Sequence, residues 1–76
     1  MSPYEKTIVA LTGCSPEEAP AVEGFLRVVY GTLDALDRPT FRREARKALR
    51  DVRANPRLAL DVARSFGLIR PAKVSP

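Results

Sequence analysis

The densest group of charged side chains lies between residues 42 and 53, where half of the residues are basic. These six are Arg42, Arg43, Arg46, Lys47, Arg50 and Arg53. On an α-helix, where each residue turns by about 100°, they fall within an arc of roughly 140°. Glu44 and Asp51 lie together at the far edge of this arc. Neighbouring cations repel each other by a few tenths of a kcal/mol per adjacent pair, so the pattern favours an anionic ligand.

Five of the six cations are arginines, whose planar guanidinium matches phosphate and carboxylate groups. The basic face therefore predicts contact with a nucleic-acid backbone. The alternative is a protein-interaction module, an adaptor or inhibitor that docks this helix on an acidic partner surface and possibly self-associates. An arginine-rich face that is only solvated is the third interpretation.

The aromatic residues bear on the kind of nucleic acid. Tyr4, Phe25, Phe41 and Phe66 all fall on apolar stripes that predict a core, and only Tyr30 lies near a polar flank. Proteins that bind single strands place exposed aromatic side chains among the basic ones. We therefore expect contact with the backbone of a duplex or structured RNA, with little reading of sequence.

Residues suited to catalysis are scarce. The chain has no histidine, and the four glycines are too dispersed to form a phosphate-binding loop. Cys14 is the only cysteine, and its place between Gly13 and Ser15 predicts a small apolar plug at a corner between helices. The carboxylate pair Glu17–Glu18 is interpreted as helix capping. These features predict a regulatory or binding protein that is not an enzyme, with no metal, no cofactor and no small-molecule substrate.

Composition and charge place the chain among ordinary globular proteins. Its 76 residues are 45% hydrophobic and 29% charged, which predicts a single domain. Residues 1–36 carry a net charge of −3 (two basic, five acidic side chains), whereas residues 37–76 carry +7 (eleven basic, four acidic). No apolar run approaches the roughly 18 residues of a membrane span, and the first residues do not resemble a signal peptide. We therefore expect a cytoplasmic protein with no membrane association.

Helix start and stop signals predict an all-α fold, a small four-helix bundle with short loops. Prolines stand at first-turn positions at residues 3, 16, 39 and 56, and glycines follow apolar periodic segments at residues 13 and 67. The predicted helices span about 3–12, 16–36 with a kink or restart at Pro20, 38–54 and 56–66. Residues 1–69 form the predicted helical domain, and residues 70–76 a flexible tail.

Apolar residues at helical spacing predict which faces form the core. The segment 16–36 contributes Val22, Phe25, Leu26, Val29, Leu33 and Leu36. The segment 38–54 contributes Phe41, Ala45, Ala48, Leu49 and Val52. The last helix contributes Leu58, Val62, Ala63 and Phe66.

A second face of the segment 16–36 carries small residues. Ala21, Gly24, Val28, Gly31 and Ala35 step by three and four positions, so they share one side of a helix. Glycine inside a helix costs about 1 kcal/mol relative to alanine, and close approach of another helix would offset that cost. The approaching helix belongs either to the same chain or to another protein molecule. In the second case this face is an oligomer or partner seam, and the sequence allows both.

The segment from Thr7 to Glu23 resembles a helix-turn-helix motif, with a glycine in the turn and apolar residues on both sides. The would-be recognition helix begins with two carboxylates and two prolines at residues 16–20, and offers no Arg, Lys, Asn or Gln there. Such a start does not suit a groove lined by phosphates. We interpret this segment as a helical corner.

Overall fold

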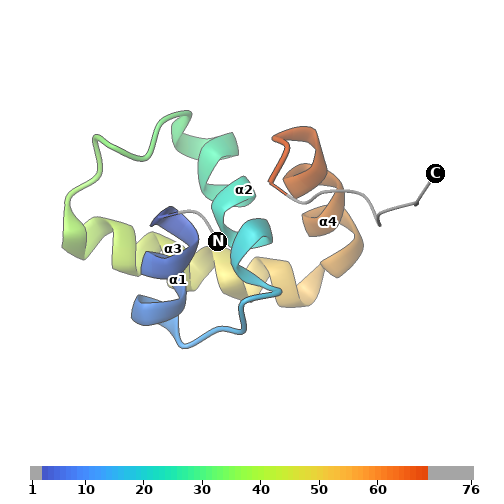
Figure 1. Cartoon of the computed structure of the whole chain (residues 1–76), viewed down its shortest axis with the longest axis horizontal. Coiled ribbons are helices and arrows are strands. Elements are labelled where there is room, and N and C mark those ends of the chain that lie inside the picture. Colours follow the sequence, from blue (N-terminus) through green and yellow to red (C-terminus); the bar gives the residue numbers. More distant parts are fainter. Residues whose placement is uncertain (1–2, 69–76) are drawn as a thin grey trace.

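The chain folds into four α-helices, as a computed structural model that describes residues 3–68 shows (Figure 1). The helices are α1 (Pro3–Thr12), α2 (Ala19–Tyr30), α3 (Arg38–Ala54) and α4 (Pro56–Ser65). Residues 3–68 contain no β-strand, so the predicted all-α bundle is confirmed. The predicted tail at residues 70–76 lies outside the described residues.

Two helices have the predicted bounds and a third differs by one residue, because prolines, glycines and Asn55 stand at their ends. α1 and α3 agree at both ends, and α4 is one residue shorter than predicted. Asp37, in an extended conformation, is the N-cap of α3. Asn55 is the single residue between α3 and α4 and caps both helices. Gly67 follows α4 with a φ of 71°, a left-handed conformation that ends a helix at little cost for glycine.

α2 is shorter than the predicted segment 16–36 at both ends. It begins at Ala19 with Pro20 in its first turn, where a proline is tolerated because the missing N–H has no helical partner. The prediction of a restart at Pro20 is therefore correct. Helix α2 ends at Tyr30 because Gly31 adopts a φ of 75° and its N–H donates to the carbonyl of Arg27 at 2.8 Å. The helix does not reach residue 36.

The turn before α2 is closed by reciprocal side-chain bonds. The backbone N–H of Ser15 donates to Oε1 of Glu18 at 3.0 Å, and the backbone N–H of Glu18 donates to Oγ of Ser15 at 3.3 Å. This pairing is a capping box, and it confirms that Glu18 serves the helix start. Cys14, just before this turn, is 4% exposed and belongs to the core, as the predicted apolar plug requires.

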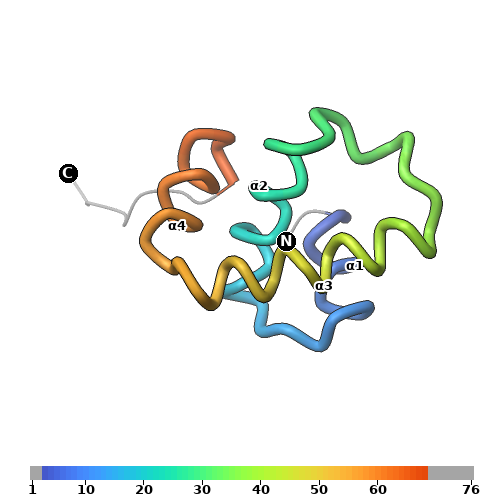
Figure 2. Tube along the Cα trace, turned by 180° about the vertical axis from the view of Figure 1, so that it is seen from behind, coloured from blue at the N-terminus to red at the C-terminus, as the bar shows by residue number. Residues whose placement is uncertain are grey.

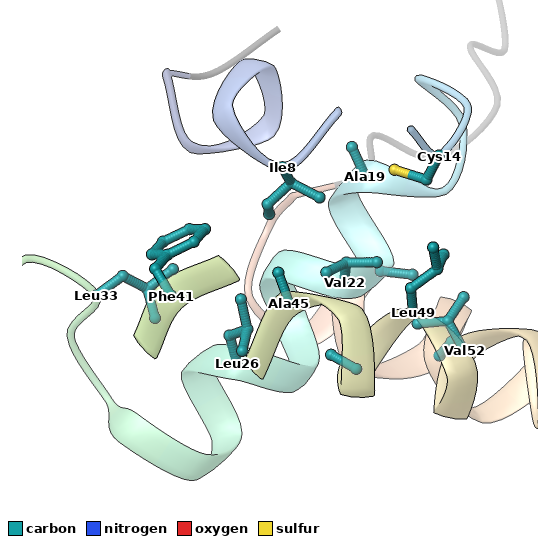
Figure 3. Packing of buried hydrophobic residues seen from close by; sticks show 13 residues of the cluster. Ile8, Cys14, Ala19, Val22, Leu26, Leu33, Phe41, Ala45, Leu49 and Val52 are labelled. Atoms are coloured by element: carbon teal, nitrogen blue, oxygen red, sulfur yellow. The ribbon is translucent and has the colours of Figure 1, made fainter. Parts of the chain in front are cut away.

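α2 lies at the centre of the fold and contacts the other three helices. Figures 1 and 2 show it between α1 and α4, with α3 running along one side of the bundle. Figure 3 shows side chains from α1, α2 and α3 converging on one core. Its buried apolar members are Ile8, Cys14, Ala19, Ala21, Val22, Leu26, Leu33, Phe41, Ala45, Ala48, Leu49, Val52 and Ala59.

Three residues predicted for the core are exposed instead. Val29 is 71% exposed, Leu58 56% and Phe66 43%. α4 packs against α2, with Val62 and Ala63 against Gly24, and its buried residues are the small Ala59 and Ala63. Leu33 is buried as predicted, but it reaches the core from the loop after α2.

Within residues 3–68, no helix combines the length and the apolar character needed to cross a membrane.

Candidate nucleic-acid interface

α3 separates its apolar and basic side chains onto different faces. Its inner face consists of Phe41, Ala45, Ala48, Leu49 and Val52, which are all buried. The six predicted basic residues are all exposed. The helix therefore places its cations in solvent because its apolar residues recur at the spacing that faces the core.

Three arginines of this face have no carboxylate partner. Arg42, Arg46 and Arg50 form no ion pair within residues 3–68. They recur at intervals of four residues, so each lies about one turn further along the helix. We refer to Arg42, Arg46 and Arg50 as the arginine row. Uncompensated guanidinium groups in a row repel one another, and an anion relieves that repulsion.

The arginine row borders a shallow hollow that also includes two further predicted cations. The hollow has a volume of about 290 Å³ and is lined by Pro39, Arg42, Arg43, Arg46, Lys47 and Arg50. Five of the six predicted residues therefore line one surface, and Arg53 does not.

Arg43 and Lys47 share one carboxylate, that of Glu44. Nε of Arg43 lies 3.4 Å from Oε2 of Glu44, and Nζ of Lys47 lies 3.8 Å from the same atom. Burial raises the pKa of Glu44, but hydrogen bonds from Tyr30 and Arg43 and the charge of Lys47 outweigh it and lower this pKa. Both contacts are long and solvent-exposed, so they neutralise the two cations only in part.

Arg53 is engaged elsewhere in the fold. Its Nε donates to Oε2 of Glu18 at 2.8 Å, and its Nη2 donates to Oε1 at 3.2 Å. This two-pronged contact lowers the pKa of Glu18 from 4.5 to about 2, helped by the hydrogen bond from Ser15. It ties the start of α2 to the end of α3. Arg53 is therefore placed to hold the fold together, and only the other five predicted residues form the candidate surface.

Arg38 is a further candidate that the sequence pattern missed. It is exposed, precedes Arg42 by four residues and has no ion pair within the described part of the chain. Arg38 lies outside the predicted cluster because it is separated from the dense run of cations by three uncharged residues, Pro39, Thr40 and Phe41. Its spacing of four residues from Arg42 is the sequence feature that places it on the same side of the helix as the arginine row.

The small residues predicted for one face of α2 do not stay together. Ala21 and Gly24 are buried, and a Cβ on Gly24 would lie 3.3 Å from the backbone of Ala63 in α4. Close packing within the chain therefore accounts for Gly24. Val28 is 62% exposed, and Gly31 and Ala35 follow the end of α2, so these three do not continue the seam.

The other features leave α3 as the best candidate. α2, which would be the recognition helix of a helix-turn-helix, buries Ala19, Ala21, Val22, Glu23, Gly24 and Leu26. Its exposed residues Val28, Val29 and Tyr30 lie at its C-terminal end, whereas a recognition helix contacts base edges with its N-terminal residues. Residues 3–68 contain no group of three or more side chains suited to hold a metal ion. Comparison with known proteins gave no matching family model, no similar curated protein and no similar solved structure.

Proposed function

We propose that this protein is a small binding protein whose helix α3 contacts the phosphate backbone of a duplex or structured nucleic acid. The observation that carries the proposal is the arginine row, three exposed guanidinium groups without a carboxylate partner in residues 3–68. Arg43 and Lys47 border the same hollow, and Arg38 extends the row toward the start of the helix. Guanidinium groups on one helix face suit phosphates spaced along a strand.

The surroundings of the row support a backbone contact rather than single-strand binding. The described aromatic residues with substantial exposure are Tyr30 and Phe66, at 36% and 43%. Neither lines the hollow beside the row. Bases of a single strand therefore have no stacking platform next to the cations. The expected binding depends on phosphate charge and discriminates little between sequences.

Anisotropy titrations of labelled duplex DNA, structured RNA and single strands, each at about 50 and about 200 mM salt, test this proposal. Neutralising the row (Arg42→Gln/Arg46→Gln/Arg50→Gln) removes up to three phosphate contacts. The slope of log K against log salt on duplex DNA should then fall by about 2.7. Affinity should drop by a similar factor for unrelated duplex sequences.

A control of equal charge separates the row from the overall charge of the protein. The control replaces three exposed cations outside α3, namely Lys6, Arg57 and Arg64, by glutamine. Both triple variants carry a net charge of +1, three less than the +4 of the natural chain. The proposal requires the row variant to lose far more affinity than the control. Equal losses would point to non-specific attraction, and no salt-sensitive binding to any nucleic acid would favour the acidic-protein alternative.

A further inference from the structure

A second surface, on the other flank of α3, is apolar. A groove of about 560 Å³ lies between α2, α3 and α4. Its apolar lining includes Val28 and Val29 from the last turn of α2 and Leu58 from the first turn of α4, which are 62%, 71% and 56% exposed. Side chains of this kind are costly to leave in water when they lie together. The groove is therefore suited to contact with protein.

The charges around the groove alternate in sign along α3. Glu44, Lys47 and Asp51 all line it. Lys47 reaches toward Glu44, whereas Asp51 forms no ion pair within residues 3–68. A basic peptide would meet Lys47, and an acidic one would meet Asp51. A partner surface with a carboxylate opposite Lys47 and a cation opposite Asp51 would form a favourable pair with each of them.

We propose that the groove is a self-association surface, in which a second copy of this chain packs its own groove against the first with the two α3 helices antiparallel. A two-fold axis between residues 47 and 51 brings Lys47 of each copy opposite Asp51 of the other. Such an interface is isologous, so each favourable contact is formed twice. Val28, Val29 and Leu58 of the two copies then shield one another from water. The proposal does not depend on nucleic-acid binding.

The size of the groove sets the expected strength. A standard stable interface buries about 800 Å² on each partner, with about 20–30 residues a side, whereas eleven residues line the groove. We therefore expect a weak dimer with a dissociation constant in the micromolar range.

The arginine row remains free in this dimer. Arg46 and Asp51 are about 140° apart around α3, and neither Arg46 nor Arg50 lines the groove. Lys47 lines both surfaces, so the variant that separates them is Val29→Asp, whose position lines the groove alone.

Sedimentation equilibrium over concentrations from about 1 μM to about 1 mM tests the proposal directly, because it covers the expected range. The natural chain should shift from monomer to dimer mass. Val29→Asp places a carboxylate at an exposed apolar position and should abolish dimerisation without unfolding the chain. A natural chain that stays monomeric throughout would overturn the proposal and leave the groove to another partner.

Charge exchange tests the predicted pairing. Lys47→Asp alone places two acids opposite each other, and Asp51→Lys alone places two lysines opposite each other, so each variant should dimerise at least tenfold more weakly. An equimolar mixture of the two variants restores opposite charges at both contacts. The mixture should therefore form a heterodimer at concentrations where each variant alone is monomeric. A mixture that associates no better than its components would overturn the antiparallel pairing.

Matched charge reversals at positions that do not line the groove provide the control. Arg64→Asp and Asp61→Lys produce the same changes in net charge as the two test variants. Both residues are exposed on α4, and neither lines the groove. These variants should dimerise as the natural chain does. Helical circular dichroism, unchanged in all variants, verifies that each one folds.

Discussion

The contact between Glu18 and Arg53 yields the most specific prediction about stability. It joins residues 35 positions apart through two hydrogen bonds of 2.8 and 3.2 Å. The perturbation is Glu18→Gln. Glutamine keeps a side-chain oxygen that can accept the N–H of Ser15, so the substitution removes the charge while leaving the capping box able to form.

The pKa of Glu18 sets the magnitude and the sign of this effect. A fall of the pKa from 4.5 to about 2 on folding corresponds to at most about 3 kcal/mol at neutral pH. Glu18 is 26% exposed and Arg53 59% exposed, so water screens the pair, and we expect about 1 kcal/mol. Because the folded-state pKa is the lower one, this stabilisation is present above pH 4.5. It is lost as the pH falls toward 2.

Urea unfolding of the natural chain and of Glu18→Gln between pH 7 and pH 2 measures the effect. The difference in free energy of unfolding should be about 1 kcal/mol at pH 7, and it should close as the pH falls from about 4.5 to about 2. Glu17→Gln removes a charge at the exposed neighbouring position, which forms no ion pair within residues 3–68, and should change the free energy of unfolding at pH 7 less than Glu18→Gln does. A difference for Glu18→Gln that is absent at pH 7, or that stays constant down to pH 2, would refute the assignment of Arg53 to the fold.

Three further predictions concern the interior. Gly24→Ala should lower the free energy of unfolding by about 1 kcal/mol in urea titrations, because overpacking against the backbone of Ala63 outweighs the gain in helix propensity; a stabilised variant would contradict this. Arg27→Met should lower the free energy of unfolding by about 2 kcal/mol in the same assay, since it removes a charge-assisted hydrogen bond of 2.9 Å to Glu23; a neutral effect would show that this pair contributes little. Cys14 is 4% exposed, so a thiol reagent should modify it slowly until urea unfolds the chain, and rapid modification of the folded protein would contradict its burial.

Comparison of the predicted and observed helix bounds shows which sequence signals are sufficient to locate a helix end. α1 and α3 are predictable because residues with special backbone geometry stand at their ends, and local chemistry alone decides where each helix begins and stops. α2 is different, because Leu33 and Leu36 continue its apolar spacing past the true end. Gly31 ends the helix, yet it also fits the series of small residues. Gly31 ends the helix because its φ is positive, and the sequence alone does not show which conformation a glycine adopts.

The candidate surface was only partly predictable, for a related reason. Helical periodicity places the cations of α3 on the outside, which the structure confirms. The periodicity of α3 cannot predict the ion pair between Arg53 and Glu18, because Glu18 lies at the start of α2. The groove was missed because Val29 and Leu58 each fit the core spacing of their own helix. The structure instead places Val62 and Ala63 against Gly24 and leaves Val29 and Leu58 exposed.

The acidic residues of α3 lie on one side of the helix only. Glu44 and Asp51 stand on the groove side of the helix, whereas the arginine row on the other side has no acid paired with it in residues 3–68. Under the proposed function, a phosphate backbone would therefore approach α3 from the side of the row. The groove side carries both signs, and its mixed charges suit a protein surface better than a nucleic acid. In the proposed dimer, each copy would keep its own row free, so two rows would act on one nucleic acid. The affinity of the pair would then exceed that of either row alone, because the second contact becomes intramolecular.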